Sequence, residues 1–446
     1  MARVRRALTI AGSDSGGGAG IQADLKTFAA LGVHGMSAIT SVTAQNTVEV
    51  RAIHDIPPEM VRTQIESVVE DIGVDAAKTG MLSSARIISA VAKTVEQYDF
   101  PVVVDPVMIA ESGAYLLRED AIDTLVERMI PVARVVMPNR HEAERLSGIP
   151  IKTRDDAKKA ARIIKRMGAD AVIIKGGHMG RSATDILYYK NRFVEFRGRR
   201  ISGCTHGTGC SFSAAVTASL AKGCELTEAV DIAKRFVTMA IRYGENIGHG
   251  PCPVNPTAWM GKDAERWRVY DALQGALQKL VKRTMADYVP EVGMNMAYAL
   301  PPSYAKGIED VAAVDGRITR TKKGVREGHV AFGASRHLAG ALLKMMEFDE
   351  DMRAVMNIRY DPALVAMART LFITSSYSRA EEPETIKKRE GASVPWGIET
   401  AIKKAGKVPD VIYHEGDIGK EPMILIFGND PGDVLRKFGK LTGQKR

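Results

Sequence analysis

The chain has 446 residues, is 45% hydrophobic and 26% charged, and carries a net charge of +9. At roughly 100–200 residues per domain, this length indicates two or three globular domains and excludes a small scaffold that depends on cross-links. The basic residues form no long run and no nucleic-acid motif accompanies them, so we expect phosphorylated small molecules as partners and no nucleic acid.

No apolar run approaches the roughly 18 residues that cross a bilayer, so we expect no membrane association. The basic start of the chain leads at once into a short apolar run and glycines, which indicates a first strand and not a signal peptide. The four cysteines, Cys204, Cys210, Cys224 and Cys252, show no CxxC spacing, and we therefore expect neither a disulfide framework nor a zinc site. Sparse cysteines fit a reducing compartment, and we expect a cytoplasmic protein.

The first half of the chain alternates short apolar runs with amphipathic segments. The predicted strands cover 7–12, 36–42, 75–80, 102–107, 135–139 and 171–177, and the predicted helices cover 20–32, 57–73, 84–98, 141–148, 155–168, 211–223 and 226–244. Continuous apolar strands between amphipathic helices predict an α/β fold with a mostly parallel sheet covered by helices on both faces. Residues 185–201 predict an antiparallel hairpin at the edge of that sheet.

The alternating pattern stops at the Pro- and Gly-rich stretch 248–256 (GHGPCPVNP), which is typical of a domain boundary. We therefore predict a first domain at 1–258 and a second, smaller mixed α/β domain at 262–446. A charged helix over 264–283 opens the second domain.

A glycine-rich segment, GSDSGGGAG at 12–20, joins the first predicted strand to the first helix. Its glycines permit a close approach of the backbone to a ligand. The segment is not a Walker A loop, because no GK[ST] closes it. A tight turn without a ligand is the competing interpretation.

Polar residues follow two neighbouring strands. Asp105 ends the predicted strand 102–107, and Asn139 and Glu142 follow the next strand. The carboxyl ends of strands are the ligand-binding edge of open α/β sheets. Carboxylate and amide oxygens are Mg²⁺ ligands, so we expect Asp105 and Glu142 to hold Mg²⁺ and Asn139 to lie beside a cofactor. A lone glutamate in a helix is more often a solvated residue, and this is the alternative interpretation of Glu142.

The strongest signal is THGTGC at 205–210, which opens a long apolar helix. Successive N–H groups at a helix N-terminus form an anion site, and they would stabilise charge on a transferred phosphoryl group. Cys210 lies at the same positive helix end, which lowers the pKa of a thiol. We therefore expect Cys210 to be a base for a substrate hydroxyl, with a small packing residue as the alternative.

Seven segments of the first half occur in one order: GSDSGGGAGIQADLKTF, TAQNT, AKTGML, VVDPVM, MPNRHEAE, IKGGH and THGTGC. Together they resemble the hydroxymethylpyrimidine/phosphomethylpyrimidine kinases of the ribokinase superfamily. The resemblance implies a ribokinase-like fold and two successive phosphorylations that use ATP and Mg²⁺. It further implies a pyrimidine pocket at Gly12, Asp24, Gln45 and Met81, a nucleotide segment at Lys175, Gly176, Gly177 and Gly207, an anion hole at Thr208 and Gly209, and a base at Cys210.

The second half carries four clusters of polar residues: VDGRITRTKKG, GHVAFGASRHLA, VMNIRYDP and HEGDIGKEPMILIFGNDP. As a set they resemble the ThiN-type thiamine-phosphate synthase domain, which implies coupling of the pyrimidine diphosphate to a thiazole phosphate with release of pyrophosphate. Arginine and histidine can stabilise such a leaving group. We expect Arg320 and His337 to be catalytic, and Arg317, Arg336, Asn357, Arg359 and Lys420 to bind substrate.

Two alternatives stay open on the sequence. The alternative for the second domain is a ligand-sensing module without catalysis, although 262–290 offers one long helix and no helix-turn-helix. The alternative for the first domain is a pyridoxal-type or a sugar kinase. Gln45 and Cys210 argue against a sugar substrate, and pyridoxal stays open. By analogy with ribokinase-like kinases, we expect a homodimer or a higher homo-oligomer.

Overall fold

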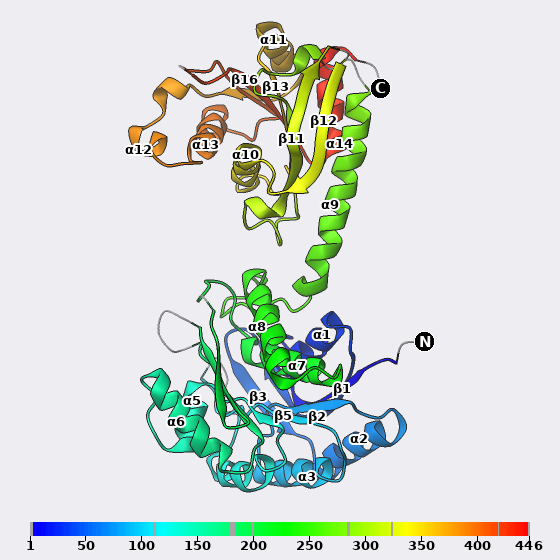
Figure 1. Ribbon diagram of the computed structural model, residues 1–446, viewed down its shortest axis with the longest axis vertical. Coiled ribbons are helices and arrows are strands. Elements are labelled where there is room, and N and C mark those ends of the chain that lie inside the picture. The colour runs from blue at the N-terminus through cyan, green and yellow to red at the C-terminus, as the bar shows by residue number, and fades with distance from the viewer. Residues whose placement is uncertain are drawn as a thin grey trace. The chain divides into compact units, whose positions relative to one another are not determined.

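The computed structural model describes residues 3–109, 113–177, 183–198, 200–282, 286–322, 324–417 and 419–444. Contacts within the chain divide it into two units, Met1–Met260 and Gly261–Arg446. Each unit has its own sheet and its own helices (Figure 1). In the part of the chain that is described, no helix is long and apolar enough to cross a membrane.

The first unit is built on a nine-stranded sheet in the order β3-β2-β1-β4-β5-β6-β7-β8-β9. Neighbouring strands from β2 to β7 pair in parallel, and antiparallel pairs close both edges. The mostly parallel sheet and the edge hairpin are therefore confirmed. The strands are β1 (Arg6–Asp14), β2 (His34–Gln45), β3 (Val50–Asp55), β4 (Ala76–Thr79), β5 (Val102–Val104), β6 (Val135–Val136), β7 (Ala171–Ile174), β8 (Asp185–Tyr189) and β9 (Arg192–Phe196).

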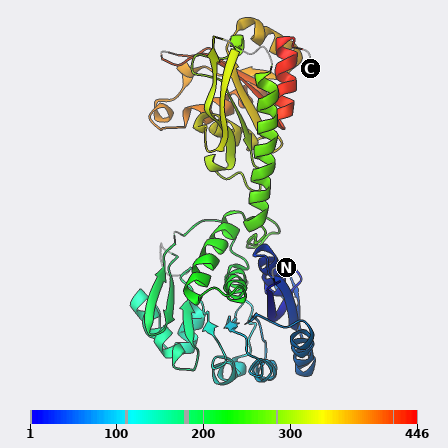
Figure 2. The ribbon, with the colours of Figure 1, turned by 45° about the vertical axis from the view of Figure 1, so that its right-hand side comes forward.

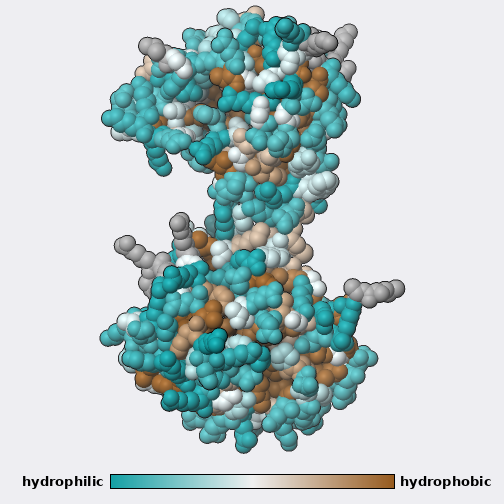
Figure 3. Space-filling view, in the orientation of Figure 1, coloured by the Kyte–Doolittle hydropathy of each residue, from teal (hydrophilic) through white to brown (hydrophobic). Residues whose placement is uncertain are grey.

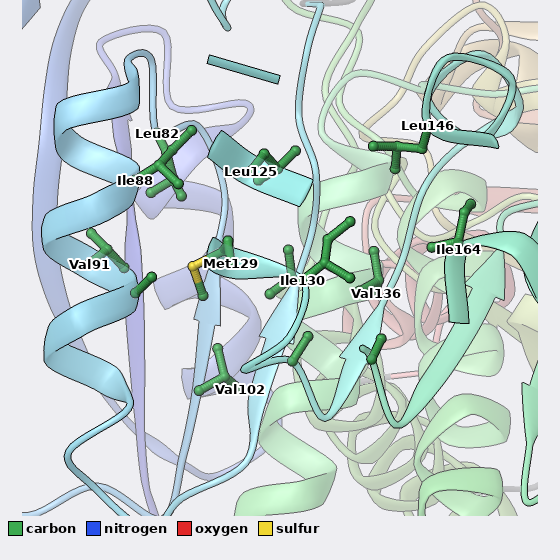
Figure 4. Close-up of a cluster of buried hydrophobic side chains, with 14 of the residues drawn as sticks. Leu82, Ile88, Val91, Val102, Leu125, Met129, Ile130, Val136, Leu146 and Ile164 are labelled. Atoms are coloured by element: carbon green, nitrogen blue, oxygen red, sulfur yellow. The ribbon is translucent and has the colours of Figure 1, made fainter. Parts of the chain in front are cut away.

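Helices cover both faces of this sheet (Figure 2). One face packs on α2, α3 and α6, and the other on α1, α7 and α8. Figure 4 shows part of the first core, where Met129 and Ile130 lie between Ile88 of α3 and Val102 and Val136 of the sheet. The helices are α1 (Gly20–Ala30), α2 (Pro58–Asp71), α3 (Ala85–Val95), α4 (Ile122–Thr124), α5 (Arg140–Ser147), α6 (Arg154–Lys165), α7 (Thr208–Ala221) and α8 (Leu226–Arg242).

The sequence pattern did not predict β3, the outer strand at one edge. Its residues are exposed or half-buried, and its sequence VRAIHD mixes charged and apolar residues. An edge strand with one solvated side lacks the apolar run on which the prediction of the other strands rests.

The expectation that the chain lacks a disulfide is wrong. Cys204 and Cys252 form a disulfide across 48 positions of sequence. The Pro- and Gly-rich stretch returns to the THGTGC loop, where the His206 N–H donates to Cys252 O (3.1 Å) and the Val254 N–H donates to His206 O (3.0 Å). This return brings two cysteines together that no local spacing relates.

The second unit has a seven-stranded mixed sheet in the order β12-β11-β10-β13-β16-β15-β14. Its long first helix, α9, begins at Ala258 and ends at Val281, so it starts earlier than the predicted 264. The strands are β10 (Asn295–Ala299), β11 (Val311–Thr321), β12 (Gly324–Phe332), β13 (Ala354–Arg359), β14 (Thr374–Ser376), β15 (Val411–His414) and β16 (Met423–Gly428).

Helices again cover both faces of the second sheet. One core contains side chains of α9, α11 and α14, and the other contains side chains of α10 and α13. The visible surface of each unit is mostly hydrophilic (Figure 3), which agrees with apolar burial inside these cores. The remaining helices are α10 (Arg336–Met346), α11 (Pro362–Leu371), α12 (Glu384–Lys387), α13 (Ser393–Ala405) and α14 (Pro431–Thr442).

Candidate active sites

A cavity of about 1400 Å³ lies at the carboxyl ends of the parallel strands of the first unit. This is the ligand-binding edge of open α/β sheets. It brings together segments that are as far apart in the sequence as β1 and the start of α7. Of the predicted residues of this unit, those that line it are Gly12, Asp24, Gln45, Met81, Asp105, Asn139, Glu142, Lys175, Gly177, Gly207, Thr208, Gly209 and Cys210.

Gly176 does not line the cavity but shapes its wall. Its N–H donates to Asp185 Oδ1 (2.7 Å). A Cβ at this position would lie 1.9 Å from Thr184 O, so only glycine fits between the two segments.

Asp14, which the sequence analysis did not single out, holds the glycine-rich loop in place. Its carboxylate accepts hydrogen bonds from the N–H groups of Gly16 (2.8 Å), Gly18 (3.1 Å) and Ala19 (2.8 Å). Burial raises the pKa of Asp14, but the hydrogen bonds with His206 and with the N–H groups of Ala19 and Gly16 outweigh burial and lower this pKa overall. The carboxylate is therefore charged and fixes the turn.

The glycines of this loop approach the chain itself more closely than a side chain would allow. A Cβ at Gly18 would lie 2.3 Å from the His206 ring, and a Cβ at Gly207 would lie 1.9 Å from Gly18 O. Gly207 also has a φ of +82°, which favours glycine. The glycine-rich loop and the THGTGC loop are thus packed backbone to backbone, which joins two motifs of the sequence into one wall.

The N-terminus of α7 faces a buried ion pair. The Ser211 N–H donates to Gly207 O, so the N–H groups of Gly209 and Cys210 precede the helical ladder and stay available for an anion. A Cβ at Gly209 would lie 3.5 Å from Lys175 Nζ and 3.9 Å from Asp105 Oδ2. Positive charge therefore approaches this point from both the helix end and the lysine.

Lys175 donates to Asp105 Oδ1 (2.8 Å), and the Ser213 hydroxyl donates to Asp105 Oδ2 (3.0 Å). Burial alone would lower the pKa of Lys175, but the charges of Asp105 and Glu142 outweigh burial and raise this pKa. The lysine therefore keeps its charge. Glu142 is buried and forms a capping box with Asn139 at the start of α5. Burial raises the pKa of Glu142 to about 7, with Lys175 opposing and Asp105 adding to the rise.

A second buried ion pair, Lys78–Asp24, lies at the floor of the cavity. Lys78 Nζ donates to both carboxylate oxygens of Asp24 (2.8 and 2.9 Å), and the Thr9 hydroxyl donates to Asp24 Oδ2 (2.7 Å). Burial alone would lower the pKa of Lys78, but the charge of Asp24 outweighs burial and raises this pKa. The only signal of Lys78 in the sequence is a lysine in the otherwise apolar strand segment AKTG.

The expectation of a lowered thiol pKa at Cys210 is wrong. Burial raises the pKa of Cys210 to about 11, Asp24 and Asp105 add to the rise, and Lys78 opposes it. Cys210 is half-buried in the cavity wall, and the loss of solvation there outweighs the effect of the helix end, which was the only influence visible in the sequence.

In the second unit, both residues predicted to be catalytic are exposed. Arg320 is exposed on β11 and lies 3.5 Å from Asp287. His337 lies in the first turn of α10, whose cap is Ser335. Partial loss of solvation around the ring, together with the charges of Arg317 and Arg379, lowers the pKa of His337.

The other predicted residues of this unit are spread over the surface and the core. Arg336 is exposed beside Glu390 (3.1 Å), Arg359 is exposed at the end of β13, and the Arg317 guanidinium donates to Val292 O. Asn357 is buried, where its amide donates to Gly293 O (3.1 Å) and accepts from the Asn295 N–H (2.7 Å). This amide holds neighbouring strands together.

Lys420 leads to a cluster that the sequence analysis missed, here called the Glu382 cluster: Tyr377, Arg379, Glu382, His414 and Lys420. Lys420 Nζ lies 3.6 Å from Glu382 Oε2, and an Arg379 nitrogen lies 4.0 Å from the same oxygen. The rings of Tyr377 and His414 are 5.2 Å apart. The members come from two stretches of the chain, 377–382 and 414–420, which the pairing of β14 with β15 brings side by side.

Comparison with known proteins gives both units relatives. The model of the family "Phosphomethylpyrimidine kinase" matches residues 14–255, and that of "Thiamine-phosphate synthase ThiN" matches residues 272–440. A hydroxymethylpyrimidine/phosphomethylpyrimidine kinase of Bacillus subtilis is 50% identical over 260 residues, which are 57% of this chain and 96% of that protein. The bifunctional thiamine biosynthesis protein ThiDN of Methanocaldococcus jannaschii is 34% identical over 432 residues, 96% of each chain.

Solved structures resemble the first unit. A Bacillus subtilis pyridoxal kinase with ADP has a TM-score of 0.54 and 41% identity, covering 57% of this chain and 98% of that one. A Staphylococcus aureus pyridoxal kinase with AMP-PCP and pyridoxal has a TM-score of 0.53 and 37% identity, covering 57% and 94%. The predicted fold of the first unit is thereby confirmed.

Proposed function

The chain belongs to the phosphomethylpyrimidine kinase family and continues into a ThiN thiamine-phosphate synthase unit, and on this basis we propose how its residues divide the work. The protein is a bifunctional enzyme of thiamine biosynthesis. It phosphorylates hydroxymethylpyrimidine to the monophosphate and the diphosphate with ATP, and it couples the diphosphate to thiazole phosphate. The kinase activity is assigned to residues 1–258 and the coupling activity to 262–446.

One observation carries the kinase proposal: the N-terminus of α7 and the Lys175–Asp105 pair meet in the cavity. In each phosphorylation the substrate oxygen forms a bond to the γ-phosphorus of ATP while the bond to ADP breaks. The N–H groups of Gly209 and Cys210 and the ammonium of Lys175 stabilise the charge of the phosphoryl group in transit. Thr208 holds the loop by donating from its hydroxyl to Thr205 O (2.6 Å).

Asp105 and Glu142 fit the requirements of Mg²⁺ that arrives with ATP. Both carboxylates line the cavity, and Mg²⁺ usually takes one or two protein carboxylates together with waters and phosphate oxygens. Within the described residues no group of three or more His, Cys, Asp or Glu side chains is arranged for a metal, which suits an ion held mostly by the nucleotide. Bound Mg²⁺ would neutralise charge on the phosphates.

In this proposal the proton of the substrate hydroxyl passes to the thiolate form of Cys210. Gly12, Gln45 and Met81 bind the pyrimidine above the Lys78–Asp24 pair. Gln45 offers both a donor and an acceptor to an aminopyrimidine. Arg118, Arg145 and Arg200 line the same cavity and supply positive charge for the substrate that already carries a phosphate.

In the coupling step, the thiazole nitrogen forms a bond to the methylene carbon of the pyrimidine diphosphate, and the carbon–oxygen bond to pyrophosphate breaks. We assign stabilisation of the leaving pyrophosphate to Arg320 and His337, with Arg317, Arg336, Asn357, Arg359 and Lys420 as binding residues. The ThiDN relative spans both units, which supports catalysis by the second unit over ligand sensing. A homo-oligomeric assembly and a cytoplasmic location stay predictions.

A single reaction tests the proposal: the purified chain with hydroxymethylpyrimidine, MgATP and thiazole phosphate, with products resolved over time. We expect the monophosphate, the diphosphate and then thiamine phosphate. Accumulation of the diphosphate without thiamine phosphate would refute the coupling activity and leave the kinase. Absence of any pyrimidine phosphorylation would refute the kinase assignment, and pyridoxal would then be the substrate to try.

A further inference from the structure

Glu382 is a buried carboxylate that accepts no hydrogen bond from the protein. Its side chain is 0% exposed, and neither carboxylate oxygen has a hydrogen-bond partner. Arg379 and Lys420 compensate its charge only at 4.0 and 3.6 Å, and Arg379 Nε is itself buried without a partner. Buried polar atoms without partners are costly and rare in folded proteins, so this arrangement points to a ligand that supplies the missing donors and acceptors.

The neighbours of Glu382 provide a donor and a flat surface. His414 is buried, and burial, reinforced by Arg379 and Lys420, lowers its pKa to about 4, so the ring is neutral near pH 7. Its Nδ1 accepts from the Gly416 N–H (3.2 Å), which places the ring hydrogen on Nε2. Tyr377 lies beside the histidine, with its ring centroid 5.2 Å away.

The cluster therefore presents one acceptor group, one neutral donor, one aromatic ring and two cations. A metal ion does not match it, because no group of three or more metal-binding side chains occurs among the described residues. A planar heterocycle that has both an amino group and ring nitrogens, and that carries a diphosphate, matches every element. This description fits the pyrimidine diphosphate and not the thiazole phosphate, which has no amino group.

We propose that the Glu382 cluster is the binding site for the aminopyrimidine diphosphate in the second unit, where Glu382 accepts a hydrogen bond from the exocyclic amino group. His414 Nε2 donates to a ring nitrogen, Tyr377 packs against the ring, and Arg379 and Lys420 bind the diphosphate. Lys420 is the most exposed member, at 41%, so it is the side chain that moves from the carboxylate to the phosphates. The inference rests on the coupling activity proposed above.

The test compares full-length wild type with Glu382→Gln, and uses Glu381→Gln as the matched control on an exposed neighbour. Each is given the natural pyrimidine diphosphate and an analogue in which an oxygen acceptor replaces the amino group. Glu382→Gln should lower kcat/KM for the natural substrate by about 10- to 100-fold, as expected for a lost charge-assisted hydrogen bond. The loss should be smaller or reversed for the analogue, because a glutamine amide can donate to the oxygen.

The KM for thiazole phosphate and the two kinase rates should not change in any variant. Equal losses for both pyrimidine substrates, or an unchanged preference, would overturn the inference and leave Glu382 as part of a structural ion pair. Calorimetric titration with the natural diphosphate measures binding without the coupling reaction. Wild type should show two classes of sites, one in the first unit and one at the Glu382 cluster, and Glu382→Gln should weaken the second class. Failure of wild type to form thiamine phosphate would refute the proposed function, while a single unaltered class of sites would refute the Glu382 site.

Discussion

The pKa of Cys210 makes the proposed base role testable through pH. Burial and the charges of Asp24 and Asp105 raise this pKa to about 11, and Lys78 opposes the rise. At pH 7 only about one thiol in 10⁴ is then ionised. If the thiolate accepts the proton of the substrate hydroxyl, kcat/KM of the first phosphorylation should increase about tenfold per pH unit, or about 100-fold from pH 7 to pH 9.

The assay is initial-rate phosphorylation of hydroxymethylpyrimidine with saturating MgATP, measured across that range. Measurements should stop near pH 9, because the unfolded thiol loses its proton near 9.0 while the folded thiol keeps it. Above that pH the unfolded state binds fewer protons than the folded state, so the free energy of unfolding decreases.

Cys210→Ala provides the control for this experiment. Its rate should be about 10²- to 10⁴-fold lower than wild type at neutral pH, and it should be independent of pH over the same range. A wild-type profile that is flat from pH 7 to pH 9 would refute proton transfer to the thiolate. A Cys210→Ala variant with full activity would remove Cys210 from the mechanism and leave it as a packing residue.

Three further changes test other parts of the molecule. Lys78→Met should lower the free energy of unfolding of the first unit by about 3–5 kcal/mol, since it leaves a buried charge on Asp24. Adding Asp24→Asn to this variant should restore much of the lost free energy in a denaturant melt. Cys204→Ser with Cys252→Ser should lower the same free energy by up to about 4 kcal/mol, the chain-entropy value for a 48-residue loop, and unchanged melts would show that the bridge adds nothing. Arg320→Ala should slow coupling more than about tenfold with kinase rates and melting temperature unchanged, because its side chain is exposed; loss of both activities would indicate misfolding instead.

The residues predicted for the site of the first unit meet in one cavity because they follow strand ends and one helix start. Each of these is a local pattern: an apolar run that ends in a polar residue, as at Asp105, or a glycine-rich turn before a helix, as at Gly207. Such patterns meet in space once the strands are parallel. Glu142 shows the limit, because its burial depends on packing that no local pattern displays.

Interactions across long sequence separations were not predictable in the same way. Lys78 and Asp24 pair across 54 positions, and Cys204 and Cys252 pair only because the chain returns after α8. The Glu382 cluster likewise joins two stretches, one that follows β14 and one that runs from the end of β15 to the segment before β16, although Arg379 and Glu382 are neighbours within the first stretch. Of the residues predicted for the second unit, Lys420 belongs to this cluster, whereas no local pattern in the sequence indicates the buried Glu382.

Asp24 in the first unit and Glu382 in the second unit are both buried carboxylates, but they differ in the hydrogen bonds that they accept. The oxygens of Asp24 receive three hydrogen bonds, from Lys78 and Thr9, which leaves little capacity for a pyrimidine. Glu382 is equally buried and also flanked by cations, but its oxygens receive none. The capacity to accept a hydrogen bond from an aminopyrimidine is therefore greater at Glu382, in the site proposed for the second unit, than at Asp24, which the resemblance placed in the pyrimidine pocket but which Lys78 and Thr9 already occupy.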